Sequence, residues 1–392
     1  MDFSLSDEQL MIKDTTRKLL HSLGLTNIAR KFMEGDTGVL FDTWKQIGDL
    51  EFVKINIPER YGGFAQGLLS LVPVFEELGR GLVPGPYPET LAFAVPLLEK
   101  YGGEEQKQKY FKEIASGEKL FTLALYETYS QSLYDCSLQA ERHGDRFVLN
   151  GVKTYVPYGE EAHCLIVPAK TSGERGTGLS LFIVDPSETG LEFRRLNCVD
   201  KTMHLAEVTF RNAAVPVGNL LGAENEGAAL LQEGFLYLNA AICAMMVGGM
   251  ERLVELCVEY ANQRIQFGEP IGRFQAVKHK IVDMKVELEG ARSLTYYAAM
   301  SLDERLEYSF LSVGSARSFT TESFIQAATK SIDIFGGMGF TWEIDCHLYL
   351  KRARAWENYI GSPDDYREWC FPEMESQLTG GMDIVHTAKV QS

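Results

Sequence analysis

The chain has 392 residues, of which 45% are hydrophobic and 23% charged, and its formal net charge at pH 7 is -16. Such a composition is ordinary for a globular protein, and the length is enough for about two or three domains. The negative charge would repel nucleic acid and anionic membranes at long range, so we expect neither as a partner. The seven scattered cysteines indicate reduced thiols without a disulfide framework or a metal site. The lack of a targeting peptide or a long apolar span predicts a cytoplasmic protein.

Helical patterns fill residues 1–119. Ser6 followed by Gln9 predicts a capping box, and the apolar residues that come after it form a buried stripe. Further helices are predicted at 41–50, 68–79, 91–101 and 104–116, separated by segments that contain glycine and proline. We therefore predict an N-terminal α-helical domain over residues 1–119.

At residue 120 the periodicity changes. Short runs rich in Val, Ile, Phe, Leu and Thr predict strands at 121–126, 146–150, 164–169, 179–184 and 207–210. The segments 143–145 and 150–151 are typical hairpin turns. Strands that follow one another without helices between them predict a compact antiparallel sheet, here over residues 120–225.

Residues 226–392 form a helical region, with long helices predicted at 227–263, 274–302, 308–335 and 341–359. After Phe274 the apolar residues recur at alternating spacings of three and four, which is the seam of a helical bundle. Such seams favour a four-helix bundle, and the apolar faces leave room for packing as a tetramer. The predicted fold class is therefore α+β and multidomain: an N-terminal helical domain, a middle antiparallel β domain and a C-terminal four-helix bundle.

The most informative stretch is the turn at 264–275, between the first two of these long helices. Arg264 offers a guanidinium fork that suits phosphate oxygens. Gln266 and Gln275 offer amide donors and acceptors, and Phe267 can fill apolar space beside them. A turn between helices does not need these side chains, although a solvated Arg264 and a Gln275 on the helix surface would also explain the local pattern.

The turn resembles the arginine, glutamine-phenylalanine-glycine and phenylalanine-glutamine motif of the acyl-CoA dehydrogenases. The order of the domains is similar to that family over essentially the whole chain. The resemblance implies an FAD-dependent enzyme that oxidises an acyl-CoA to the 2,3-enoyl-CoA, in which a glutamate removes the C2 proton and the flavin accepts hydride from C3. It also implies a homo- or heterotetramer of family chains, with electron-transfer flavoprotein as the electron acceptor.

The same resemblance assigns cofactor contacts. It implies that the four side chains of the 264–275 turn reach the diphosphate and adenine end of the FAD bound by the neighbouring subunit. Gly336 and Gly337 are similar to a glycine pair that lets the backbone approach that FAD. Asp333 stands where the family usually has a glutamine, and it can accept a hydrogen bond but cannot donate one when ionised.

On the flavin-ring side the chain departs from the family. The segments 126–132 and 155–158 stand in place of a threonine-glutamate-proline loop and a tryptophan-isoleucine-threonine strand that meet the ring. Pro157 has neither an N–H nor a hydroxyl, so it cannot make the family's threonine contact. Tyr155 can still stack on the ring, and Ser362, at another threonine position of the family, is expected to contact the cofactor.

The family's catalytic base is missing from this sequence. Some members place the glutamate at the position of Ile360, and others at the position of Leu238. Both residues are apolar, so neither can accept a proton. The nearest carboxylates are Glu357, Asp364 and Asp365, although each is also explained as a charge at a helix end in solvent.

Three hypotheses remain open. In the first, the chain is one subunit of a heteromeric acyl-CoA dehydrogenase and lends adenine-side FAD contacts to its partner, because the residues for its own flavin are changed and those for the neighbour's flavin remain. In the second, it is a homomeric flavoenzyme with a relocated base. In the third, it is a noncatalytic member that binds CoA ligands or serves as a scaffold.

Overall fold

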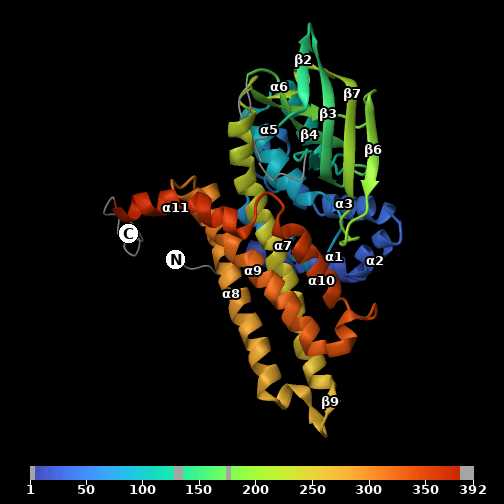
Figure 1. Ribbon diagram of the computed structural model, residues 1–392, viewed down its shortest axis with the longest axis vertical. Coiled ribbons are helices and arrows are strands. Elements are labelled where there is room, and N and C mark those ends of the chain that lie inside the picture. Colours follow the sequence, from blue (N-terminus) through green and yellow to red (C-terminus); the bar gives the residue numbers. More distant parts are fainter. Residues whose placement is uncertain (1–4, 128–135, 174–177, 380–392) are drawn as a thin grey trace.

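The computed structural model describes residues 5–127, 136–173 and 178–379 (Figure 1). Helices come first, a mostly antiparallel sheet follows, and long helices complete the chain. The predicted fold class is therefore confirmed. Figure 1 shows the sheet at one end of the molecule, and the helices α7 (Gly227–Gln263) and α8 (Gln275–Asp303) extending to the opposite end.

The N-terminal part contains the predicted capping box. The Gln9 N–H donates to the Ser6 hydroxyl at 3.2 Å, and the Ser6 N–H donates to the Gln9 side chain at 3.1 Å. The helix predicted at 91–101 differs in its first half, where the π-helical turn η4 (Glu89–Ala94) precedes α5. Apolar spacing does not separate a π-helical turn from an α-helix, and it also missed the short α2. The α-helices here are α1 (Asp7–Ser22), α2 (Asn27–Met33), α3 (Gly38–Asp49), α4 (Val72–Arg80), α5 (Val95–Tyr101) and α6 (Glu104–Ala115).

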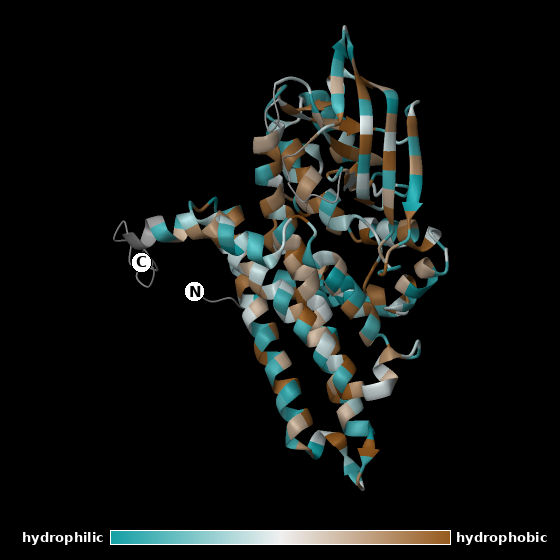
Figure 2. Ribbon diagram, viewed as in Figure 1, coloured by the Kyte–Doolittle hydropathy of each residue, from teal (hydrophilic) through white to brown (hydrophobic). Residues whose placement is uncertain are grey.

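The sheet has the strand order β6-β7-β3-β2-β4-β5-β8, with β1 beside β4. Most neighbours are antiparallel, but β1 and β2 run parallel to β4, which corrects the purely antiparallel prediction. Sequence patterns missed β2 and β6 because both are short, charged and largely exposed. Figure 2 shows hydrophobic and hydrophilic residues mixed along the long strands, as expected where one face is covered. The strands are β1 (Phe121–Leu123), β2 (Gln139–His143), β3 (Arg146–Pro157), β4 (Cys164–Lys170), β5 (Leu179–Val184), β6 (Leu191–Leu196), β7 (Leu205–Pro216) and β8 (Leu220–Leu221).

The helix α7 organises the helical core. It packs against α4 and η4 on one side and against α8 and α9 (Ser309–Phe335) on the other. Its residues 238–250 are all buried, as expected for a helix surrounded by other elements. The N-terminal and C-terminal helices therefore share one apolar core, and the sheet keeps a second, smaller core.

Two shorter helices follow α9. The helix predicted at 341–359 begins only at Cys346, because the 3-10 turn η7 (Gly336–Phe340) and a further turn precede α10 (Cys346–Glu357). The last described helix is α11 (Pro363–Thr379). It packs against α9 and projects from the body of the molecule in Figure 1.

Candidate functional site

The turn at 264–275 lies at the free end of the α7–α8 hairpin, far from the sheet (Figure 1). It contains the short strands β9 (Ile265–Gln266) and β10 (Glu269–Pro270), which pair with each other. Arg264, Gln266 and Gln275 are exposed, and 94% of the Phe267 surface is accessible. An exposed phenylalanine at a positive φ of 55° has no value for the chain's own core. The side chains of this turn are therefore accessible to a ligand or to another chain.

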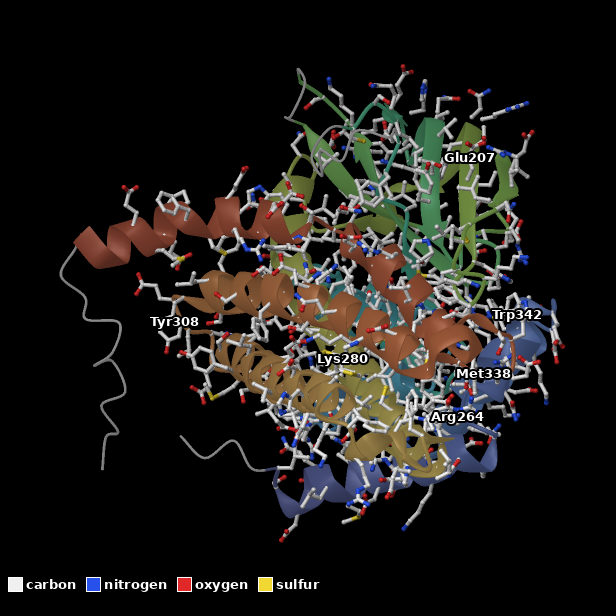
Figure 3. All side chains as sticks on the ribbon, turned by 60° about the horizontal axis from the view of Figure 1, so that its bottom comes forward. Glu207, Arg264, Lys280, Tyr308, Met338 and Trp342 are labelled. Carbon is white, nitrogen blue, oxygen red and sulfur yellow. The ribbon has the colours of Figure 1, made fainter. Side chains whose placement is uncertain are left out.

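The glycine turn reaches the same end of the molecule. The rings of Tyr260, near the end of α7, and Phe335, directly before the glycines, stack at 4.1 Å. Figure 3 shows Arg264 and Met338 at this end. A Cβ built on Gly336 or Gly337 would meet nothing within 4 Å, so the backbone there is open to a ligand.

Asp333 and Ser362 already have partners within the chain. The Asp333 carboxylate pairs with Lys280 of α8. The Ser362 N–H and hydroxyl both donate to the Asp365 carboxylate, at 2.7 Å each, at the start of α11. A contact of either residue with FAD stays a prediction, and it would require these bonds to rearrange.

The residues at both of the family's base positions are inaccessible to solvent. Ile360 is fully buried at a positive φ of 59°, and Leu238 on α7 is also fully buried. The Ile360 N–H donates to the Tyr126 hydroxyl at 2.7 Å, and the Ile360 carbonyl accepts a hydrogen bond from Tyr366. The hydroxyl that bonds the Ile360 N–H thus belongs to Tyr126, which stands at the position of the threonine in the family's threonine-glutamate-proline loop. Burial raises the pKa of Tyr126 to about 12, so the phenol stays neutral.

Of the segments predicted to face the flavin ring, residues 155–157 lie at the end of β3. Tyr155 is half-buried at a positive φ of 53°, inside an irregularity of the β3–β7 pairing. The Pro157 carbonyl accepts a hydrogen bond from the Thr122 hydroxyl at 2.5 Å. Residues 128–132 of the predicted flavin loop lie outside the described residues. Pro157 has no N–H or hydroxyl to offer the ring.

A buried ion pair anchors the start of that loop. The Lys153 ammonium and the Glu127 carboxylate are 2.6 Å apart, with side chains 0% and 4% exposed. Burial by itself would raise the pKa of Glu127, but the Lys153 charge and hydrogen bonds from Cys136, Lys153 and Ser137 lower it to about 2. The carboxylate therefore stays ionised and structural.

The carboxylates proposed as relocated bases have other partners. Glu357 pairs with Arg354 at 2.8 Å, and Asp364 pairs with Arg367 at 2.8 Å with 88% of its side chain exposed. Asp365 accepts the two Ser362 hydrogen bonds. Their role as a base stays a prediction, and their surroundings are those of ordinary helix-end charges.

A carboxyl that the sequence patterns missed contacts Tyr359, the residue before Ile360. Glu89 begins η4 and is only 5% exposed. The hydroxyl of Tyr359, the residue before Ile360, donates to Glu89 Oε1 at 2.9 Å. Burial raises the pKa of Glu89 to about 7, even though Tyr359 and the Arg352 charge lower it. In the sequence Glu89 shows only as an acidic residue near a helix start, which is a common position.

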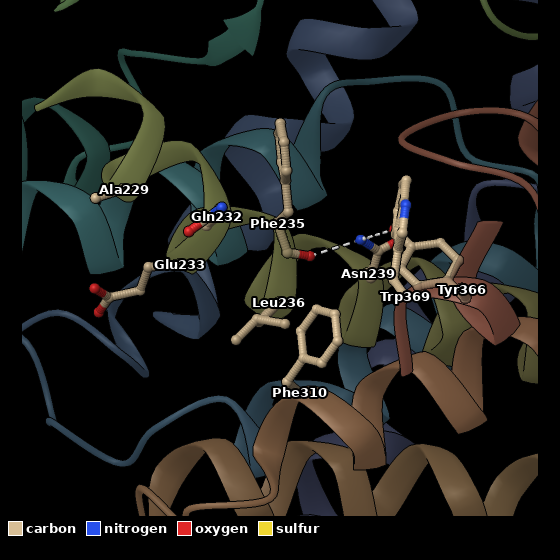
Figure 4. Close-up of a pocket in the computed structure, with 9 residues that line it drawn as sticks. All are labelled: Ala229, Gln232, Glu233, Phe235, Leu236, Asn239, Phe310, Tyr366 and Trp369. Atoms are coloured by element: carbon tan, nitrogen blue, oxygen red, sulfur yellow. Dashed lines mark hydrogen bonds between the residues drawn. The ribbon is translucent and has the colours of Figure 1, made fainter. Parts of the chain in front are cut away.

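A cavity of about 540 Å³ lies beside Asn239 and Tyr366 (Figure 4). Asn239 follows Leu238, and its Nδ2 donates at 2.7 Å each to the Phe235 carbonyl and to the hydroxyl of Tyr366, which in turn bonds Ile360. The lining is mostly apolar and contains no lysine, arginine or histidine. The residues that line it are Ala229, Gln232, Glu233, Phe235, Leu236, Asn239, Phe310, Tyr366 and Trp369.

A buried arginine, Arg317, contacts a residue of the cavity wall. Arg317 is 1% exposed, and its Nε donates to Asn239 Oδ1 at 2.9 Å. It also donates to the carbonyls of Trp356 and Tyr359, at 2.5 and 2.9 Å, at the end of α10. The negative end of the helix dipole offsets its charge. Arg317 therefore fixes the segment before Ile360 against the cavity wall.

Family models match this chain in three consecutive parts: "Acyl-CoA dehydrogenase, N-terminal domain" over residues 6–118, "middle domain" over 130–213, and "C-terminal domain" over 225–365. The chain is a member of the acyl-CoA dehydrogenase family. This family member is 30% identical to the mitochondrial isovaleryl-CoA dehydrogenase of Pongo abelii, over 92% of its length and 87% of the relative. It is also 30% identical to the acyl-CoA dehydrogenase of Bacillus subtilis (strain 168), over 93% and 97%.

Solved structures agree with this assignment. The butyryl-CoA dehydrogenase of Megasphaera elsdenii matches this family member at 25% identity with a TM-score of 0.87, over 96% and 100% of the two chains. A structure described as the electron transferring flavoprotein of Acidaminococcus fermentans contains a chain that matches at 29% identity with a TM-score of 0.87, over 95% and 99%. The glutaryl-coenzyme A dehydrogenase complex with glutaryl-CoA matches at 28% and 0.86, over 97% of each chain. This family member is accordingly an oxidoreductase of an FAD-dependent family.

The residues fit FAD unequally. The open glycine turn and the exposed Arg264 offer the space and the charge that a phosphate-bearing cofactor requires. On the ring side, Pro157 offers no donor, and the Tyr126 hydroxyl is already bonded to Ile360.

Within the part of the chain that the structure describes, no helix has the length and apolarity needed to cross a membrane.

Proposed function

We propose that this acyl-CoA dehydrogenase family member is one subunit of a heteromeric, FAD-dependent enzyme that desaturates an acyl-CoA thioester at C2 and C3. The observation that carries the proposal is the closure of its own base position, where buried Ile360 is hydrogen bonded to Tyr126 and to Tyr366. A chain closed in this way needs a partner chain to supply the base and the flavin-ring pocket.

In this proposal the chain contributes to the partner's flavin. Arg264 binds the FAD diphosphate as a charged fork, and Gln266 and Gln275 bind polar groups at the adenine end. Phe267 covers an apolar part of the same cofactor. The exposure of all four side chains supports this role, because it leaves them accessible to another chain's cofactor.

The partners follow from the same proposal. The assembly is a tetramer built through the C-terminal helices, with a second family chain that keeps the glutamate. The substrate is an acyl-CoA, and electrons leave to an electron-transferring flavoprotein. The apolar cavity beside Asn239 supports an acyl or pantetheine group there, and the phosphates of CoA would have to lie elsewhere because the lining has no cation.

The test is an FAD titration. The chain is purified alone and together with a family chain that keeps the glutamate, incubated with FAD, and passed through gel filtration before flavin is quantified. We expect little flavin on the chain alone, and flavin with acyl-CoA-dependent dye reduction in the mixed complex. Near-stoichiometric flavin on the chain alone would contradict the proposal and favour a homomeric enzyme.

A further inference from the structure

A thiol, an amine and a carboxylate meet inside the sheet domain. The Lys153 ammonium of β3 donates to the sulfur of Cys136 at 3.5 Å, and the Cys136 thiol donates to Glu127 Oε1 at 3.0 Å. The same carboxylate oxygen is 2.6 Å from the Lys153 nitrogen. Glu127 and Lys153 already balance each other's charge, so the ion pair does not need the cysteine.

The surroundings of Cys136 differ from those of the other accessible thiol. Cys136 and Cys198 are half-buried, and the remaining cysteines are buried. The Cys198 thiol bonds the backbone carbonyls of Asp200 and Met203, at 3.1 and 3.3 Å. Of the two half-buried thiols, Cys136 alone has a lysine amine as a hydrogen-bond partner among the described residues. An oxidised Cys136 sulfur would therefore have a nucleophile directly beside it.

We propose that Cys136 and Lys153 form a covalent sulfur–nitrogen crosslink when hydrogen peroxide oxidises the chain. In the first step the thiol attacks the peroxide, the O–O bond breaks, the sulfur is oxidised to a sulfenic acid, and water leaves. In the second step the Lys153 nitrogen attacks this sulfur and hydroxide leaves, as when a backbone nitrogen condenses with a sulfenic acid. The ammonium loses two protons: one converts the hydroxide to water and the other passes to solvent.

The geometry suits the second step. The 3.5 Å between the nitrogen and the sulfur is within the separation of about 3–3.5 Å from which groups react. Glu127 contacts both atoms, and its pKa of about 2, lowered by Lys153 and by hydrogen bonds against the effect of burial, keeps it ionised. Burial raises the pKa of the Cys136 thiol to about 11, so the first step is slow at neutral pH and requires excess peroxide.

The crosslink would change the electrostatics at Glu127. Once it is bonded to sulfur, the Lys153 nitrogen carries no positive charge, and the Glu127 side chain, which is 4% exposed, loses its counter-ion. The Glu127 carboxylate also accepts the Ser137 N–H at 2.6 Å. Oxidation would thus act on the segment that begins at Glu127, which is the predicted flavin loop. The reaction needs neither FAD nor a partner chain, so it goes beyond the proposed function.

The experiment maps the crosslink in the wild-type chain. The chain is purified alone under reducing conditions, treated with excess hydrogen peroxide, alkylated, and digested with trypsin for mass spectrometry. We expect the peptide 120–142, which contains Cys136, to be joined to 147–170 without cleavage after Lys153, and the pair to weigh two hydrogens less than its parts. Dithiothreitol should separate the pair. A pair of 120–142 with 154–170 would show a disulfide between cysteines and would overturn the proposal.

Variants separate the two reacting residues. Cys136→Ser should lose the crosslink completely, and the matched control Cys198→Ser should form it like wild type. Lys153→Arg keeps a cation beside Glu127, and its oxidised Cys136 should carry oxygen without joining another peptide.

The wild-type peptide map decides the question even if Lys153→Arg does not fold. A wild-type Cys136 that gains oxygen without joining Lys153 overturns the proposal, as does one that stays reduced while Cys198 is oxidised. A joined pair that retains an oxygen overturns the direct sulfur–nitrogen bond. None of these outcomes depends on the FAD titration, because no flavin is present.

Discussion

The hydroxyl of Tyr126 accepts the N–H of Ile360 at 2.7 Å, which joins the sheet domain to the segment between α10 and α11. The two residues are 234 positions apart in the chain. The bond places a phenol from the family's flavin loop directly against the family's base position. Ile360 is therefore held by hydrogen bonds with side chains of its own chain.

Removing that hydroxyl should cost stability. In Tyr126→Phe the buried Ile360 N–H loses its partner, and we expect the free energy of unfolding to fall by about 1–3 kcal/mol. Chemical denaturation measures the change. Tyr61→Phe is the control, since the Tyr61 hydroxyl bonds Glu104 at the exposed surface and its loss should change stability by less than about 0.5 kcal/mol. An equal loss in both variants would contradict the role of the Tyr126 bond.

The buried ion pair of Glu127 and Lys153 should stabilise the fold only while both charges are present. Glu127→Gln leaves the Lys153 ammonium buried without its counter-ion, so we expect a loss of about 3–5 kcal/mol. Glu127→Leu combined with Lys153→Met removes both charges and should cost less than Glu127→Gln alone. Urea unfolding of the variants measures this coupling, and a double variant that is less stable than Glu127→Gln would argue against it.

Arg264 should matter for the cofactor and not for the fold. In Arg264→Ala we expect FAD retention in the mixed complex to weaken by about 2 kcal/mol, because a charge-assisted contact to the diphosphate is lost. The melting temperature of the chain alone should not change. Arg273→Ala is the matched control, since Arg273 is exposed in the same turn and pairs with Glu269 at 2.9 Å. Unchanged FAD occupancy in the Arg264 variant would remove that residue from the cofactor site.

Glu89 should make stability depend on pH. Burial raises its pKa from 4.5 to about 7, so the folded state holds a proton that the unfolded state releases between these values. Its contribution to stability is therefore complete below about pH 4.5 and is lost as pH rises to about 7, on the order of 3 kcal/mol. In Glu89→Gln this loss should disappear. Denaturation at pH 5 and pH 7.5 compares the two proteins, and the same pH dependence in both would show that Glu89 does not titrate in this range.

Local patterns were sufficient for most of the fold. The capping box at Ser6, the long helices and the change to strands at residue 120 all follow from spacings within a few residues. The strands β2 and β6 and the π-helical turn η4 did not follow, because short charged strands and π-helical turns carry no distinct spacing. The order of helices, sheet and helices was enough to predict the fold class.

The candidate site, too, could be predicted from the sequence only in part. The sequence by itself determined that Ile360 and Leu238 are apolar and that Arg264, Gln266, Phe267 and Gln275 stand together, because a motif is a property of neighbours. Only the tertiary structure decided that Tyr126 closes on Ile360 and that Glu89 lies against Tyr359, 270 positions away. Such contacts depend on how distant elements pack, and burial, which sets the pKa of Glu89, exists only in the folded chain.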